Sequence, residues 1–138
     1  MLEEGNVSLI RKIYSAFSTG DVQTILANVS DSAQWVNYGP QTVPYAGDFT
    51  GRIKEFFQGI GGSTTDGKVI PDKFIAQGDY VVAIARYTAT VRDTGAHIDT
   101  PVAHIFTVSG GKVTSWMGFS DSASVAAAHI SAAAPSRS

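Results

Sequence analysis

Residues 80–120, YVVAIARYTATVRDTGAHIDTPVAHIFTVSGGKVTSWMGFS, decide the fold. Within them, apolar and polar side chains alternate with the two-residue period of a β-strand. Turn sequences rich in Gly, Asp and Ser separate three such segments. The segments cover residues 80–92, 97–108 and 112–120. We therefore predict a meander of three long antiparallel strands.

Two more strands are predicted upstream. Residues 69–76 form one of them, and Pro71 favours an edge position because proline cannot donate a hydrogen bond to a neighbouring strand. Residues 33–38 also alternate, with Trp35 and Asn37 on one face.

Three amphipathic helices are predicted in the first half, because apolar residues recur there every three or four positions. The first helix ends before Gly20, and Asp21 is the expected N-cap of the second. The third begins near residue 50 and ends at Gly61-Gly62, before a flexible polar connection over residues 63–67. The apolar faces contain Val7, Ile10, Ile13, Tyr14 and Phe17 in the first helix, Val22, Ile25, Leu26 and Val29 in the second, and Ile53, Phe56, Phe57 and Ile60 in the third.

This order of elements is typical of an α+β domain in which helices cover one face of a curved, mainly antiparallel sheet. Such a sheet and its helices form a cone with a concave interior, where a pocket forms readily. One domain is expected over residues 1–125. An Ala- and Ser-rich tail follows over residues 126–138, with little to bury and with His129 exposed to solvent.

The composition excludes several classes of function. Ten Lys and Arg against twelve Asp and Glu give a net charge of −2, so we expect neither a nucleic-acid nor a membrane partner. The chain has no cysteine, which removes thiolate nucleophiles and zinc–cysteine sites. His97, Asp99 and Asp93 lie beside a turn, where solvated side chains are the rule, so no metal site is predicted. The N-terminal residues lack the apolar core of a signal peptide, and a cytoplasmic protein is expected.

Three short motifs and one acidic residue point to a family. The motifs are residues 13–21 (IYSAFSTGD), 49–57 (FTGRIKEFF) and 110–113 (GGKV), and Asp121 ends the last predicted strand. Their order and spacing resemble the SnoaL-like branch of the NTF2-like superfamily, which also includes ketosteroid isomerase. The resemblance covers residues 5–123 and implies the cone-shaped NTF2-like fold, a cystatin-like α+β barrel. It leaves the function open, because the superfamily contains isomerases, cyclases, dehydratases, epoxide hydrolases and non-enzymes.

The resemblance also implies which residues occupy the catalytic positions. Ketosteroid isomerase uses an Asp as base, and a Tyr and a protonated Asp as an oxyanion hole. On this sequence these positions fall on Asn37, Ile13 and His104, and a shift of one residue replaces Ile13 by Tyr14. Because an amide cannot abstract a proton, the sequence argues against steroid isomerisation by that mechanism.

His104 is the first candidate for catalysis. It alternates with Val102 and Phe106 and therefore shares their buried or cavity-facing side. A histidine there can shuttle a proton or donate a hydrogen bond to a substrate carbonyl. The alternative is a core histidine that is hydrogen-bonded to a neighbour. Tyr14 and Asn37 are the candidates for holding the substrate oxygen.

Asp121 is the second catalytic candidate. In SnoaL-like cyclases an acidic residue at the cavity is the general acid/base of an aldol ring closure, and apolar neighbours such as Trp116 and Phe119 would raise the pKa of Asp121. The alternative is that Asp121 is the N-cap of the following helical turn. The alternation of side chains along the strand favours this alternative, because it places Asp121 on the face opposite to the cavity.

The residues expected to bind a ligand are mostly aromatic and lie on inward faces. Tyr87, for example, shares a strand face with three alanines, which leaves volume beside its ring. The predicted ligand-binding residues are Trp35, Tyr38, Phe57, Tyr87, Phe106 and Trp116.

Two functions are compatible with these residues. The first is an isomerase, cyclase or dehydratase that moves a proton on a polyketide- or steroid-like carbonyl compound without a cofactor. The second is a non-catalytic binder of a small hydrophobic molecule, and an assembly domain is a third possibility within the superfamily. The resemblance also implies a homodimer formed through the outer sheet face, where Val82, Ile84, Thr88 and Val113 are expected to point outward.

Overall fold

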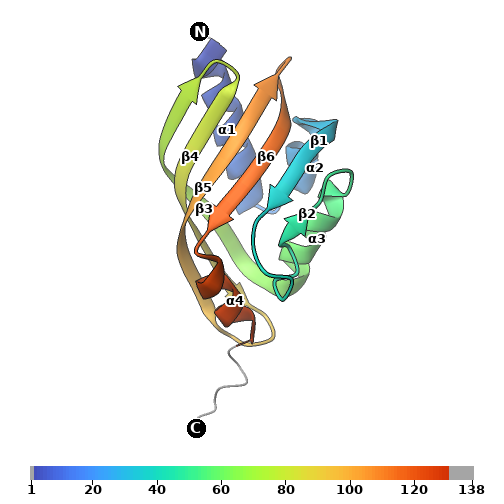
Figure 1. The fold of residues 1–138 in the computed structure, drawn as a ribbon, viewed down its shortest axis with the longest axis vertical. Coiled ribbons are helices and arrows are strands. Elements are labelled where there is room, and N and C mark those ends of the chain that lie inside the picture. The colour runs from blue at the N-terminus through green and yellow to red at the C-terminus, as the bar shows by residue number, and fades with distance from the viewer. Residues whose placement is uncertain (1, 131–138) are drawn as a thin grey trace.

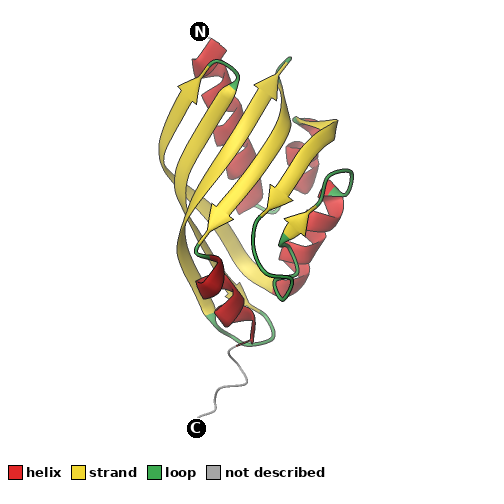
Figure 2. Cartoon of the chain, in the orientation of Figure 1, coloured by secondary structure: helices red, strands yellow, loops and turns green. Residues whose placement is uncertain are grey.

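A single curved sheet and the helices on its concave side make up the part of the chain that the structure describes (Figures 1 and 2). The structure is a computed structural model and describes residues 2–130. Its elements, in chain order, are α1 (Leu2–Ser18), α2 (Val22–Ala27), β1 (Val29–Asn37), β2 (Gly47–Asp48), α3 (Ile53–Ser63), β3 (Thr64–Gln77), β4 (Tyr80–Val91), β5 (His97–Ser109), β6 (Lys112–Ser120) and α4 (Ser122–Ile130).

The strands lie in the order β2-β1-β6-β5-β4-β3. β1 runs parallel to β6, and the other neighbouring strands are antiparallel. The predicted α+β class is therefore confirmed, including the three-strand meander of residues 80–120. The edge position expected for the strand with Pro71 is also confirmed, because β3 is an outermost strand and its pairing register shifts between Pro71 and Lys73.

The first helical hairpin forms as its sequence indicates, except that α2 ends at Ala27, so Val29, which was expected on the apolar face of the second helix, is the first residue of β1. Asp21 caps α2, with its carboxylate accepting a hydrogen bond from the Thr24 backbone N–H at 3.1 Å. Gly20 supplies the positive φ of 74° that the short connection requires.

The predicted end of the third helix and the flexible connection after it are wrong. α3 continues through Gly61-Gly62 to Ser63, and β3 begins at the next residue, Thr64. Pairing with β4 extends to this point, and the polar residues are absorbed as a register shift between Thr65 and Lys68. Asp66 within this shift has a positive φ of 57°. The polar composition therefore marked an irregularity within a strand and not a loop.

The outward position predicted for Val113 is also wrong, since this side chain is fully buried. The β5–β6 register shifts between the pairs Thr107–Ser115 and Val108–Val113, so β6 carries one extra residue there. An extra residue in a strand moves the side chains on one side of it to the opposite face of the sheet. Val113 and Trp116 consequently both face the core. The other three residues expected on the outer face are half-buried.

The C-terminal segment packs more than its composition predicts. Residues 122–130 form α4, in which Val125 and Ala128 are buried. The predicted domain boundary at residue 125 lies inside this helix, and residues 131–138 of the predicted tail lie outside the described part. His129 is half-buried and hydrogen-bonded, which corrects the expectation that it is exposed to solvent.

Gly118 is the position on β6 where the absence of a side chain is required. A Cβ there would lie 2.5 and 2.6 Å from ring carbons Cη2 and Cζ2 of Trp116, and 2.8 Å from Asn37 Oδ1. The Trp116 ring thus folds back along its own strand, over the glycine. It is held there by the Trp35 ring, which stacks on it with 4.9 Å between centroids.

We predict that Gly118→Ala lowers the free energy of unfolding by about 1–3 kcal/mol, because the added methyl group displaces a packed indole. The matched control is Gly61→Ala in α3, where an added Cβ meets nothing within 4 Å. This control should be neutral or stabilising by up to about 1 kcal/mol, since alanine favours the helix. Urea unfolding of both variants measures the difference. Equal stabilities would contradict the packing described for Trp116.

Candidate functional site

A cavity of about 90 Å³ lies between the helices and the concave face of the sheet. Every element except β2 contributes to its wall. Lining residues come from α1 (Ile13, Tyr14, Phe17), α2 (Ile25), β1 (Trp35, Asn37), the following loop (Tyr38, Gly39, Pro40, Val43, Tyr45, Ala46), α3 (Phe56, Phe57, Ile60), β3 to β6 (Val69, Tyr87, Val102, His104, Phe106, Trp116, Phe119, Ser120) and α4 (Ser122, Val125).

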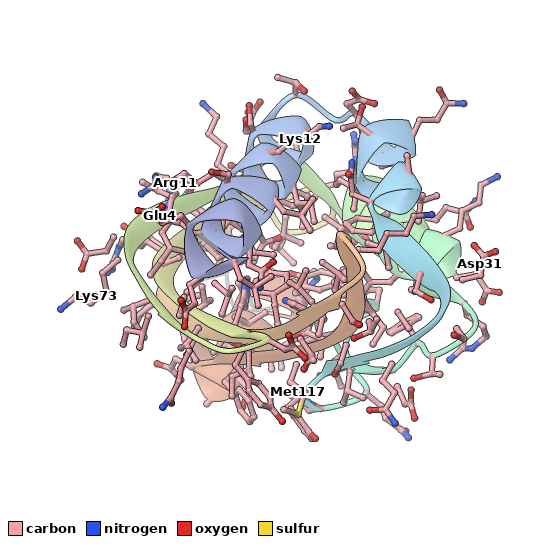
Figure 3. The ribbon with its side chains drawn as sticks, turned by 90° about the horizontal axis from the view of Figure 1, so that it is seen from above. Glu4, Arg11, Lys12, Asp31, Lys73 and Met117 are labelled. Atoms are coloured by element: carbon pink, nitrogen blue, oxygen red, sulfur yellow. The ribbon has the colours of Figure 1, made fainter. Side chains whose placement is uncertain are left out.

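The cavity wall has no Asp, Glu, Lys or Arg among its described residues. The charged side chains labelled in Figure 3, such as Glu4, Arg11 and Lys73, lie around the outside of the sheet and helices. An interior of this kind has a low effective dielectric, so it penalises charge on any group inside it. The cavity therefore suits a neutral and largely apolar molecule.

The Tyr14 hydroxyl and Nδ1 of His104 form a hydrogen bond of 2.7 Å in the wall of this cavity. Tyr14 is 6% exposed and His104 is 8% exposed. Their rings also contact Phe106 and, for His104, the Trp116 ring at 5.1 Å between centroids. Nε2 of His104 makes no hydrogen bond to any described residue, so this nitrogen is available to a ligand.

Burial holds both members of the pair in their neutral forms. It lowers the pKa of the His104 imidazole from 6.5 to about 4 and raises the pKa of the Tyr14 phenol far above its ordinary value. At neutral pH the site thus contains neither an imidazolium nor a tyrosinate.

A neutral pair joined by one hydrogen bond has two proton arrangements. When the Tyr14 phenol donates to Nδ1, the proton of His104 is on Nε2, which becomes a donor. When Nδ1 carries the proton and donates to the phenol oxygen, Nε2 becomes an acceptor and the phenol proton is released for another partner. The pair can therefore either donate a proton to a ligand or accept one from it.

A second group of polar side chains connects the cavity to α4. The Tyr45 hydroxyl is hydrogen-bonded to Nε2 of His129 at 2.9 Å, and the Tyr87 hydroxyl donates to the Tyr45 oxygen at 3.5 Å. Burial raises the pKa of both phenols. Nδ2 of Asn37 donates to the Tyr45 backbone carbonyl at 2.9 Å, which fixes the loop between β1 and β2 against the sheet. These contacts close one end of the cavity with α4.

Tyr38 and Phe119 mark where the cavity reaches the surface. Their rings stack with centroids 4.9 Å apart and planes inclined by 17°. Both also line the cavity, and they are 48% and 41% exposed. Exposed aromatic rings beside an opening provide an apolar surface for an incoming ligand.

The structure brings most of the predicted site residues together. Tyr14, Asn37 and His104 line the cavity, as do all six residues predicted to bind a ligand. Of the two alternatives on α1, Tyr14 contacts His104, and Ile13 also lines the cavity. Asp121 lies apart from them. It is exposed, and its carboxylate accepts a hydrogen bond from the Ser124 backbone N–H at 3.2 Å as a cap of α4.

Sequence reasoning missed Tyr45 as a residue of the cavity wall and His129 as its hydrogen-bond partner. The spacing of Val125 and Ala128, three positions apart in an Ala-rich segment, was the available signal that α4 packs. Asp99, one of the three residues considered for a metal site, pairs with Arg86. Within residues 2–130, no group of three or more His, Asp or Glu residues is placed to hold a metal ion. No described helix has the length and apolarity to cross a membrane.

Comparisons with known proteins agree with this architecture. The family model for a SnoaL-like domain matches residues 10–116. Bal32a, from a soil-derived mobile gene cassette, is 27% identical with a TM-score of 0.82, and the alignment covers 91% of this chain and 97% of that one. An NTF2-like protein from Burkholderia xenovorans LB400 is 25% identical with a TM-score of 0.80, covering 92% and 97%.

TerC, which was co-crystallised with polyporic acid, has the same fold. It is 24% identical with a TM-score of 0.81, covering 91% of this chain and 98% of TerC. Among curated proteins, no sequence matches this chain.

We predict that His104 makes the protein less stable in weak acid. As the pH falls below 6.5, the unfolded chain takes up a proton on this histidine while the folded chain, with a His104 pKa of about 4, does not. The free energy of unfolding should therefore drop by about 2 kcal/mol more between pH 7.5 and pH 5.0 in the wild type than in His104→Gln. Urea unfolding at the two pH values measures this.

The matched control is His97→Gln, which changes an exposed histidine on the same strand. It should keep the wild-type dependence on pH. If His104→Gln and His97→Gln lose the same stability between the two pH values, His104 is not held neutral by burial.

Proposed function

We propose that this chain, which belongs to the SnoaL-like domain family, binds a small neutral carbonyl compound in its cavity and moves a proton on it without a cofactor. The observation that carries the proposal is the buried Tyr14–His104 hydrogen bond in an uncharged cavity, with Nε2 of His104 unoccupied. Such a pair is placed to polarise a carbonyl oxygen, as a neutral histidine does in other proton-transfer enzymes.

The size of the cavity limits the substrate. Pockets for drug-sized ligands measure roughly 300–1,000 Å³, and the cavity of about 90 Å³ is much smaller. It accommodates about one ring of a ligand, and a second ring would lie at the mouth between Tyr38 and Phe119. This favours one- or two-ring polyketide-like compounds over a four-ring steroid.

The pair supports a transfer in which no group acquires a net charge. His104 gives its Nε2 proton to the carbonyl oxygen, while Nδ1 takes the phenol proton of Tyr14. The Tyr14 oxygen takes a proton from the carbon next to the carbonyl. The ketone becomes an enol, the phenol is restored, and His104 keeps its proton on Nδ1. The reverse transfer to another carbon of the enol system restores the first tautomer and yields an isomer.

This route fits the electrostatics better than a route through a charged base. No carboxylate lines the cavity among the described residues, and Asp121 has its own role as a cap of α4. An imidazolium at position 104 would be unfavourable, because burial lowers the pKa of that ring. Asn37 already uses one N–H to hold the loop, and its amide can steady the substrate oxygen but cannot remove a proton.

A non-catalytic binding protein is the second candidate. The observation that favours it is the same lowered pKa, since a histidine with a pKa of about 4 is a weak base at neutral pH. In that case the Tyr14–His104 pair would serve as a hydrogen-bond donor to the ligand and would transfer no proton.

We predict that the wild-type protein accelerates exchange of deuterium into 1-tetralone, a two-ring aromatic ketone, at the carbon next to its carbonyl. Exchange in D₂O is followed by proton NMR. His104→Gln and Tyr14→Phe should each reduce the enzyme-dependent rate by about 100-fold or more, the usual scale for loss of a general acid or base. Both variants should still bind, as measured by a ligand-induced rise in the unfolding temperature.

His97→Gln is the control and should exchange at the wild-type rate, because this histidine is exposed and does not line the cavity. Binding of 1-tetralone without exchange would favour the non-catalytic candidate. Absence of both binding and exchange would remove the proposed function.

A further inference from the structure

A second cavity lies beside the one that holds the Tyr14–His104 pair. Its volume is about 400 Å³, against about 90 Å³ for the first cavity. Three apolar side chains line both cavities, Phe17 of α1 and Phe57 and Ile60 of α3. Because the same side chains form a wall of each cavity, they lie between the two. We call these three residues the partition.

The partition is held by two helices and by β3. The rings of Phe17 and Phe57 have their centroids 6.3 Å apart and their planes inclined by 51°. Phe57 and Ile60 are three positions apart on α3 and therefore share a helix face. The Phe17 ring also packs on Gly67 of β3, where an added Cβ would lie 3.4 Å from its Cζ. Gly67 lies within the register shift of β3, so the irregular part of that strand supports the ring.

The partition separates two different environments. The wall of the first cavity has no Asp, Glu, Lys or Arg among its described residues, whereas Asp66 and Arg92 line the second cavity. Both of these side chains are exposed to solvent, and Arg92 Nε donates to the Gly61 carbonyl at 3.1 Å at the end of α3. The apolar first cavity is thus closed by the partition against a larger, polar and solvated space.

The partition begins one helical turn from the Tyr14–His104 pair. Phe17 follows Tyr14 by three positions on α1, which is a rise of about 4.5 Å along the helix. Residues at this spacing lie on the same face of a helix, and both of these line the first cavity. A ligand whose carbonyl oxygen contacts the pair therefore meets the partition after about the length of one ring, if it extends along α1.

We propose that Phe57 and Phe17 are specificity-determining residues that limit the length of the ligand, because they close its cavity against the second one. On this side, a compound longer than the first cavity is excluded by the partition. Without the partition, the joined space would fall within the roughly 300–1,000 Å³ of pockets for drug-sized ligands. The inference rests on the proposed function, since it anchors the ligand at the Tyr14–His104 pair, and it adds the residues that select among ligands by length.

The test compares 1-tetralone with 6-phenyl-1-tetralone, which carries one more ring at the end away from the carbonyl, by isothermal titration calorimetry. Phe57→Ala removes a ring of the partition and joins the two cavities. Relative to the wild type, it should shift the ratio of the two dissociation constants about tenfold in favour of the longer probe, because the added phenyl group then becomes buried.

Phe17→Ala opens the same partition from α1 and should shift the ratio in the same direction. Phe17 is half-buried, so this variant removes less buried surface than the loss of a core ring and supplies the test even where Phe57→Ala does not fold. The unfolding temperatures of the ligand-free variants show which of them are folded.

Phe56→Ala is the matched control. It removes the same ring from the neighbouring residue, which lines the first cavity but not the second. Phe56 is 5% exposed and packs against the rings of Trp35 and Trp116, so its loss enlarges the first cavity without joining it to the second. The ratio of the two dissociation constants should stay within about threefold of the wild-type value.

The outcomes separate this inference from the proposed function. If 1-tetralone exchanges deuterium but the folded partition variants keep the wild-type ratio, the inference is overturned and the proposed function stands. An equal shift in Phe56→Ala also overturns the inference, because a larger first cavity would then explain it. If the ratio shifts through Phe57 and Phe17 but no exchange occurs, the inference holds and the protein is a binder. Failure of every protein to bind either probe overturns both.

Discussion

The hydrogen bond between Tyr14 and His104 is the constraint on which the rest of the structure depends. It joins α1 to β5 across 90 residues of sequence, in an interior that has little else to offer a polar group. Loss of either partner would leave a buried polar atom unsatisfied, which costs more than the net contribution of the bond itself. The register of α1 above the sheet is therefore fixed at this point. The height of the cavity between helix and sheet follows from it.

Around this bond, the sheet is shaped so that aromatic rings pack beside the imidazole in the wall of the cavity. Gly118 lies opposite His104 in the β5–β6 pairing, and its missing side chain lets the Trp116 ring fold into the space beside the imidazole. Because of the bulge in β6, the side chains of Val113 and Trp116 both point inward. Val113 packs in the hydrophobic core, and Trp116 lines the cavity. Aromatic rings thus form a continuous wall from His104 to Trp35, and the polar atoms of this wall keep fixed positions.

Much of this arrangement could be predicted from the sequence, for a simple reason. In a strand, the two-residue period assigns each side chain to a face once the strand is identified, which is why His104, Tyr87 and Trp35 were placed correctly. On a helix, the side chains of neighbouring residues point about 100° apart. The sequence alone therefore does not decide whether Ile13 or Tyr14 contacts His104, because the answer depends on how α1 packs on the sheet. Bulges such as the one before Trp116 have no reliable sequence signal, because they are set by the partner strand. The contact of His129 with Tyr45 joins residues that are 84 positions apart, and neither the strand period nor the helix period indicates such a contact.

The low charge of the chain bears on the reaction and the ligand that the cavity can support, because the cavity wall is uncharged among the described residues. A wall with no ionised side chain among its described residues supplies no counter-charge to a charged intermediate, so it favours the proposed transfer, in which protons move in a coupled way between neutral groups. A phenol hydrogen-bonded to an imidazole meets this requirement, because the proton lost from one nitrogen is replaced at the other. The same argument applies to the ligand. A carboxylate or an ammonium group would lose its hydration and find no counter-charge, whereas a carbonyl oxygen needs a hydrogen-bond donor alone, and the Tyr14–His104 pair in the wall can supply one. The scarcity of charge thus favours a neutral ligand and, if the proposed activity holds, a proton transfer between neutral groups.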